Sequence, residues 1–273
     1  MSSRPARRSL APELWVCHLG VVPYPDAMAM QERIRALRIA GELPDTLLLL
    51  EHPPVYTRGR RSGAADLPFG EDFYRTKGIE VVDTDRGGRL TYHGPGQLVG
   101  YPIMAVEDIG RYLRTMESAI VEALDGEGIA ARSRHEEGVD YTGVWVGERK
   151  IASIGVHVSR GVSTHGFAVN VDNDLDPFSW VLACGLADVS MTSIARESAG
   201  AGSALAAGRA PGERSLTCFR RRIAHSFCEA HSRRQRLVSP RRLGIDTANA
   251  AGLAAERAPI KSTQPRREEA VPA

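Results

Sequence analysis

Two residues of this chain, a cysteine and a lysine, have the clearest capacity for chemistry. Cys184 stands between small residues at the end of an apolar segment, and the following Gly185 would leave its thiol accessible. The thiolate is the nucleophile, and an ordinary cysteine, with a pKa of about 8.5, is mostly protonated at neutral pH, so a reactive thiol needs a positive neighbour. Lys150 is the candidate, because it is the only lysine between Lys77 and Lys261. A desolvated lysine can also act as a base. The alternative is that Cys184 is simply a small buried hydrophobe.

A second candidate is the segment from Arg86 to Ile103, where glycines and prolines surround Tyr92 and His93. Glycine lets another molecule approach the main chain closely, and proline fixes φ and removes a donor, so the segment suits a binding wall. Taken alone, it could equally be a turn that reverses the chain. Its glycines form neither GxGxxG nor GxxxxGKS/T, so neither a dinucleotide site nor a P-loop is predicted.

The remaining histidines and cysteines indicate structure more than chemistry. His157 and His165 fall on predicted strands and could be bases or ligands, but strand histidines are more often structural. No pair has metal-ligand spacing, and the carboxylates of 172–176 lack the glycine and final glutamate of an EF-hand loop, so we expect no metal. The other cysteines are expected in the core: Cys17, Cys218 and Cys228.

The elements that would position these residues alternate between strand and helix at first and become successive antiparallel strands later. This order predicts an α+β domain with a mixed sheet. Apolar periodicity predicts helices from an N-cap at Asp26 to Gly41, over 108–125 and over 216–231. Strands are expected at 13–19, 46–50, 79–82, 98–104, 129–132, 143–158 as a hairpin turning at Gly147-Glu148, 164–171 and 189–194.

Composition sets the domain boundaries. With 273 residues, 42% apolar and 25% charged, the chain can bury a full core,. No apolar run approaches a membrane span, the four cysteines are too sparse for a disulfide scaffold, and we expect a cytoplasmic protein. We predict a disordered lead-in at 1–12, one folded domain at 13–231 with a flexible insertion at 198–212, and a disordered tail at 232–273. The tail carries eight arginines and one lysine against four acids, a net +5, whereas the whole chain carries only +2.

Four motifs, in this order, resemble the octanoyltransferases of lipoate biosynthesis over about residues 14–195. The resemblance implies a single domain similar to the biotin and lipoate protein ligases. One departure is Ala183, where the family usually has proline before the cysteine. The motifs are Arg86-Gly-Gly-x-x-Thr-Tyr-His-Gly-Pro-Gly-Gln-Leu-Val-x-Tyr-Pro, Lys150-Ile-Ala-x-Ile-Gly, His165-Gly-x-Ala-x-Asn and Cys184-Gly.

The resemblance implies a two-step acyl transfer. Cys184 would take octanoyl from the phosphopantetheine thioester of octanoyl-acyl carrier protein. A lysine of a lipoyl domain, in 2-oxoacid dehydrogenase E2 subunits or the glycine cleavage H protein, would then attack the thioester and form an amide. Lys150 matches the family lysine that lowers the cysteine pKa and serves as acid and base. Thioester exchange is nearly isoenergetic and aminolysis runs downhill, so no cofactor is expected.

The resemblance also implies an acyl slot whose narrow, glycine-rich walls would let an alkyl chain lie against backbone, with His93 shaping the slot. The binding residues carried over are Arg86, Gly87, Gly88, Arg89, Leu90, Thr91, Tyr92, His93, Ser153, Ile154, Gly155, Gly166, Phe167 and Ala168.

Two other functions stay open at this point. In an ATP-dependent lipoate or biotin ligase, Lys150 would contact an acyl-adenylate and no cysteine would be needed. In a binding module, the tail at 232–273 would contact nucleic acid, but Lys150, Cys184 and the Gly/Pro segment would then have no use. A weaker use of the tail is attraction to the acidic carrier protein.

Overall fold

An eight-stranded mixed sheet forms the centre of the computed structural model, which describes residues 11–181, 189–200 and 213–245. In spatial order the strands are β11 (Arg234–Leu237), β1 (Glu13–Val21), β2 (Asp45–Glu51), β6 (Gln97–Ile103), β10 (Val162–Asn170), β9 (Arg149–Ser159), β8 (Gly143–Val146) and β7 (Arg132–Ser133). The first three strands of this order run parallel and the remaining neighbours pair antiparallel, so the expected α+β class with a mixed sheet is confirmed.

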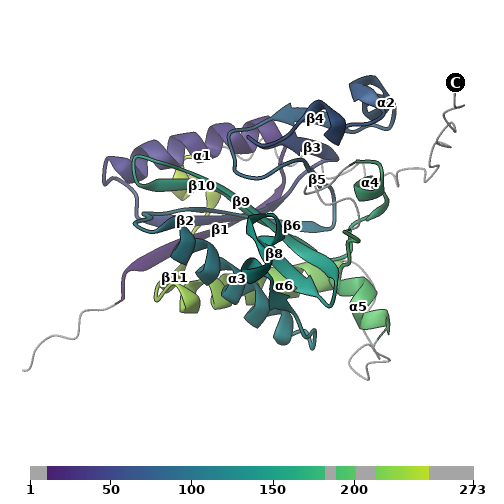
Figure 1. Cartoon of the computed structure of the whole chain (residues 1–273). Helices are drawn as coiled ribbons and strands as arrows, with labels where there is room; N and C mark the ends of the chain where they lie inside the picture. Colours follow the sequence, from purple (N-terminus) through teal and green to yellow (C-terminus); the bar gives the residue numbers. More distant parts are fainter. Residues whose placement is uncertain (1–10, 182–188, 201–212, 246–273) are drawn as a thin grey trace, which may run out of the picture.

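Helices cover both faces of this sheet (Figure 1). Helix α1 (Tyr24–Ile39) lies on one face, and α3 (Ile109–Asp125) and α6 (Glu213–Ala230) lie together on the other. The central strand β2 is buried along its whole length, as its continuous apolar run predicts,. Because side chains alternate along a strand, Leu47 and Leu49 enter the core under α3 and α6, and Leu48 and Leu50 enter the core under α1,.

A second, three-stranded sheet packs at one end of the first, in the order β4 (Glu80–Asp83), β3 (Val55–Arg58) and β5 (Thr91–His93). Helices α2 (Gly70–Thr76) and α4 (Asp176–Ser179) accompany it, and its core is largely aromatic. The sequence predicts β4 but not β3, β5 or α2. Each of these elements is short and lies beside proline or glycine. In a sequence, such a segment is typical of a loop, because the strands that pair with it are not adjacent in the chain.

Several predicted boundaries shift. Helix α1 begins at Tyr24, two residues before the expected cap Asp26, because proline in a first turn has φ already set for a helix,. Helix α3 follows the prediction, since the Asp108 side chain accepts a hydrogen bond from Arg111 N at 2.9 Å. The hairpin of β8 and β9 forms as expected, whereas the strand expected at 129–132 is displaced to β7. Four short 3-10 helices complete the described elements: Ala64–Asp66, His135–Glu137, Val139–Tyr141 and Pro240–Leu243.

Three C-terminal predictions differ from the structure where it describes their residues. The strand expected at 189–194 is reduced to an isolated bridge between Met191 and Lys150, and α5 (Ile194–Gly200) takes in the first residues of the expected flexible insertion. The tail expected to be disordered from residue 232 forms β11, because the open edge of β1 offers it unpaired backbone groups,. The expectations for 1–10, 201–212 and 246–273 fall outside the described residues. Among those that are described, no helix is long and apolar enough to cross a membrane.

Candidate active site

A cavity lies between the loop that precedes β5 and the strands β9 and β10. Lys150 and most of the predicted acyl-binding residues line it together, although they come from three separate segments of the chain. The predicted residues on its wall are Arg86, Gly88, Arg89, Leu90, Thr91, His93, Lys150, Ser153, Ile154, Gly155, Gly166, Phe167 and Ala168.

Two predicted binding residues do not line the cavity. Tyr92 points to the opposite side of β5 from Thr91 and His93, as alternation along a strand requires, and packs in the aromatic core 5.5 Å from the Tyr56 ring,. Gly87 instead joins the loop to β9, because its N–H donates to Val156 O at 2.9 Å. Both residues therefore hold the wall in place rather than form its surface.

Glycine is required where the backbones of the wall meet. A Cβ atom on Gly155 would lie 2.8 Å from Gly87 O, and one on Gly166 would lie 2.2 Å from Gly100 O. Side chains at these positions would push the loop off β9 and separate β10 from β6. The glycines of the motifs thus allow the close backbone approach that makes a narrow cavity.

Arg86 is a buried guanidinium that ties the loop to β3. Its Nη2 donates to Thr57 O at 2.5 Å and to Thr57 Oγ1 at 2.7 Å, and its Nη1 donates to Gly87 O at 3.2 Å. These bonds position the loop, and Arg86 also lines the cavity.

Lys150 reaches the cavity from β9 with only 2% of its surface exposed. Its ammonium lies 5.2 Å from the centre of the Trp145 ring, within the range of a cation–π contact,. Gly143 makes room for the side chain, since a Cβ atom there would lie 2.8 Å from Lys150 Cε. The Lys150 backbone bonds to Ser190 O and to Thr192 N, each at 2.9 Å.

Cys184 and its neighbours 182–188 lie outside the described residues, so its predicted role is not tested. Of the other cysteines, Cys17 and Cys228 are buried in the two cores as expected, and burial raises the pKa of Cys17 to about 12 and that of Cys228 to about 11. Cys218 was expected in the core but is exposed, because it lies on the outer face of α6.

Within the described ranges, no group of three or more His, Cys, Asp or Glu side chains could hold a metal ion.

A cluster of rings closes one side of the cavity, and the sequence predicted only its His93 as a binding residue. Tyr24 stacks on His93 at 5.8 Å, and both rings line the cavity together with Tyr101. His52 stands behind them: its Nδ1–H donates to Val22 O at 2.6 Å and its Nε2 accepts from the Tyr101 hydroxyl at 2.6 Å. These rings come from α1, β5, β6 and the loop after β2, so no local motif identifies the cluster.

Burial keeps the histidines of this cluster neutral. Burial lowers the pKa of His52 to about 4. Burial, aided by His52, lowers the pKa of His93 well below its ordinary value. His93 Nδ1–H donates to Gln97 Oε1 at 2.6 Å. His93 is therefore a neutral, hydrogen-bonded part of the wall.

His165 and Asp85 form a polar contact at the edge of the cavity. His165 Nε2 lies 2.7 Å from Asp85 Oδ1 and His165 Nδ1 lies 3.3 Å from the Tyr24 hydroxyl. The hydrogen bond from His165 is the main cause that lowers the pKa of Asp85 to about 2. His157, the other strand histidine, faces the same carboxylate at 3.5 Å.

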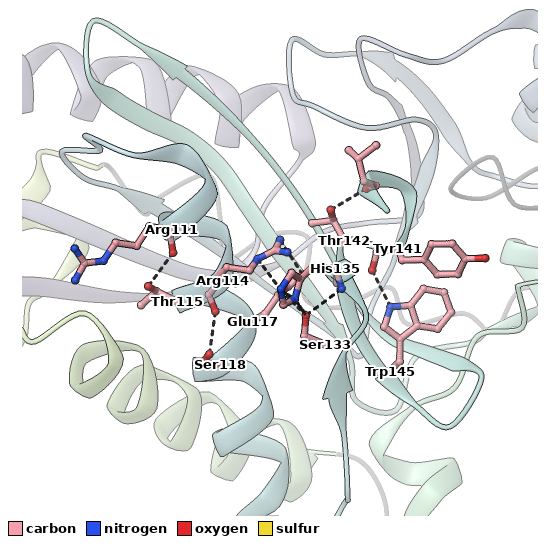
Figure 2. A network of polar contacts seen from close by, with 12 residues as sticks. Arg111, Arg114, Thr115, Glu117, Ser118, Ser133, His135, Tyr141, Thr142 and Trp145 are labelled. Atoms are coloured by element: carbon pink, nitrogen blue, oxygen red, sulfur yellow. Dashed lines mark hydrogen bonds and ion pairs between the residues drawn. The ribbon is translucent and has the colours of Figure 1, made fainter. Parts of the chain in front are cut away.

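Beside the cavity, Glu117 of α3 holds the start of β8 (Figure 2). This fully buried carboxylate accepts hydrogen bonds from Gly143 N at 2.9 Å and from Ser133 Oγ at 2.6 Å. Ser133 Oγ also lies 2.9 Å from His135 Nδ1. In a catalytic triad the histidine stands between the serine and the acid, whereas here the serine does, so the set is structural. It fixes the backbone at Gly143 and thereby holds the preceding residue Thr142, which lines the cavity.

The fold and the sequence both have known counterparts. The chain superposes on a bipartite lipoate protein ligase of Thermoplasma acidophilum with a TM-score of 0.61, over 90% of this chain and 91% of that one, at 19% identity. Residues 23–204 match the family model of the lipoyl protein ligase A/B catalytic domain. The octanoyltransferase of Rubrobacter xylanophilus is 50% identical over 182 residues, which are 65% of this chain and 80% of that protein. The octanoyltransferase of Caldicellulosiruptor bescii is 44% identical over 185 residues, 66% of this chain and 80% of that one. The chain belongs to the octanoyltransferase family.

Proposed function

We propose that this enzyme takes octanoyl from octanoyl-acyl carrier protein onto Cys184 and passes it to a lysine of a lipoyl domain. Membership of the octanoyltransferases makes the chain an acyltransferase of protein lipoylation. The carrier-bound donor, the cysteine thioester and the acceptors, lipoyl domains of 2-oxoacid dehydrogenase E2 subunits and the glycine cleavage H protein, are the parts that we propose.

The observation that carries the proposal is that Lys150 shares one cavity with the three glycine-rich segments. Apolar side chains, among them Leu90, Ile154 and Phe167, line the same cavity. Removing an alkyl chain from water is favourable by about 0.8 kcal/mol per buried CH₂ group. The cavity thus combines a slot for an acyl chain with a buried cation, which suits a thioester whose carbonyl lies near Lys150.

The proposed chemistry balances without a cofactor. The Cys184 thiolate attacks the thioester carbonyl of the donor, the new thioester forms, and the phosphopantetheine thiol leaves with a proton. The amine of the acceptor lysine then attacks the Cys184 thioester, an amide forms, and the cysteine thiol is released. The Lys150 ammonium would stabilise the thiolate and transfer the protons.

The test is mass spectrometry of the protein after incubation with octanoyl-acyl carrier protein. We expect an octanoyl adduct on Cys184 that hydroxylamine removes, and none in Cys184→Ala. Cys218→Ala is the matched control, because Cys218 is an exposed thiol outside the proposed chemistry. Lys150→Ala should form the adduct at least about 100-fold more slowly, as expected for the loss of a proton-transfer group.

Two results would contradict the mechanism. One is full octanoyl transfer to a lipoyl domain by Cys184→Ala. The other is release of pyrophosphate from ATP with free octanoate as the donor, which would instead support the ligase alternative.

A further inference from the structure

We infer that His165 forms the closed end of the acyl slot and thereby sets the length of the acyl chain that the enzyme transfers. The inference rests on the proposed use of the cavity as an acyl slot. It assigns to His165 a role in specificity that is separate from the chemistry at Lys150 and Cys184.

His165 separates two cavities. Its side chain lines both the slot and a second, outer crevice between α1 and the segment that follows β4. The two ring nitrogens face opposite compartments: Nδ1 faces Tyr24, which lines the slot, and Nε2 faces Asp85, which lines the crevice. A single imidazole ring, held from both sides, thus forms this part of the wall between the slot and the crevice.

The ring stands at a suitable distance from the reacting end. In the pairing of β9 with β10, His165 lies opposite Val156, six residues along β9 from Lys150. Six residues of strand span about 20 Å. That span is comparable to an extended lysine side chain followed by an extended eight-carbon thioester. A chain whose carbonyl lies at Lys150 and which runs along Gly166 to Ala168 would therefore end near His165.

The backbone at His165 supports a dedicated role. Its φ is +56°, in the left-handed region that residues other than glycine rarely adopt,. The His165 N–H donates to Gln31 Oε1 at 2.6 Å, and this bond from α1 holds the unusual conformation. Strained backbone that the surroundings hold in place is concentrated at functional sites. Here the conformation aims the imidazole between Tyr24 and Asp85.

The experiment compares chain lengths in competition. Equal amounts of octanoyl- and dodecanoyl-acyl carrier protein are offered together, and mass spectrometry measures the two products on a lipoyl domain. His165→Gly removes the ring and accepts the positive φ, so it should raise the dodecanoyl-to-octanoyl ratio by about tenfold or more, the discrimination that a few methylene groups provide. His165→Asn also tolerates this φ, and its shorter side chain should raise the ratio by a smaller factor.

His157→Ala is the matched control, because His157 faces the same Asp85 carboxylate but lines neither cavity. It should leave the ratio as in the wild type. The ratio comes from active molecules alone, so partial misfolding of a variant does not change it, and His165→Asn decides if His165→Gly does not fold.

The possible failures are distinguishable. If wild-type protein transfers octanoyl but both His165 variants keep its ratio, or if His157→Ala raises the ratio equally, the inference is wrong and the proposed function stands. If wild-type protein transfers no octanoyl from the carrier, the proposed function itself fails.

Discussion

Glu117 anchors the strand β8 that begins beside the cavity. Glu117→Ala would leave the Gly143 N–H and the Ser133 hydroxyl without their acceptor in a buried site, which should reduce the free energy of unfolding by about 2–4 kcal/mol,. Glu117→Gln keeps one acceptor oxygen and should lose clearly less. Urea denaturation of the two variants measures the difference. Equal losses would mean that the side chain acts by its volume and not by its hydrogen bonds.

For single residues, the sequence predicts those site residues that form a contiguous motif or belong to a residue type that is rare in the chain. Lys150 is identifiable because the chain uses so few lysines, and the residues from Arg86 to His93 form one unbroken motif. Tyr24 and Glu117 could not be predicted, because each lies on a helix that is far along the chain from the motifs of the site. Their contributions exist only once α1 and α3 pack on the sheet.

Among the elements, β11 shows most clearly why a prediction fails. Arginine-rich segments with few large apolar groups are typical of disorder, yet the edge of β1 gives this one a partner,. Two arginines of β11 pair with Glu13, which makes the charge look like the cause of the ordering. The apolar side chains that follow are the stronger cause, because Leu243 and Ile245 are almost fully buried.

The two causes predict different results. A chain ending at residue 231 should be less stable than one ending at residue 245 by about 3 kcal/mol or more, since burial of each large aliphatic side chain contributes about 1.5–3 kcal/mol. The double variant Arg234→Ala, Arg236→Ala should lose less than about 1 kcal/mol, because exposed ion pairs contribute little. Thermal and urea unfolding compare the three proteins. If the double variant were as unstable as the chain ending at residue 231, the arginine charges would be the main cause of the ordering of β11.

For the whole molecule, buried neutral histidines predict a loss of stability in mild acid. Burial lowers the pKa of His52 and of His231 to about 4. Unfolding exposes these rings to water, where their pKa is about 6.5, so between these values the unfolded chain binds more protons than the folded one. The free energy of unfolding should therefore be fully present above pH 6.5 and fall as the pH decreases toward 4.

His231→Gln isolates this effect away from the cavity. It should reduce the pH dependence by about one proton between pH 4 and 6.5. His225→Gln is the matched control, because it removes an exposed histidine of the adjoining helix α6. Urea unfolding at several pH values measures both slopes, and an unchanged slope in His231→Gln would place the acid sensitivity elsewhere.

The cavity lies where the two sheets meet, with one wall from the loop that leads into β5 and the other from β9 and β10. An octanoyl chain in this place would contact both sheets and complete the apolar packing between them. In the proposed mechanism, the bound acyl chain would add apolar contacts that the free enzyme lacks. The acyl-enzyme would then resist heat and proteases better than the free enzyme.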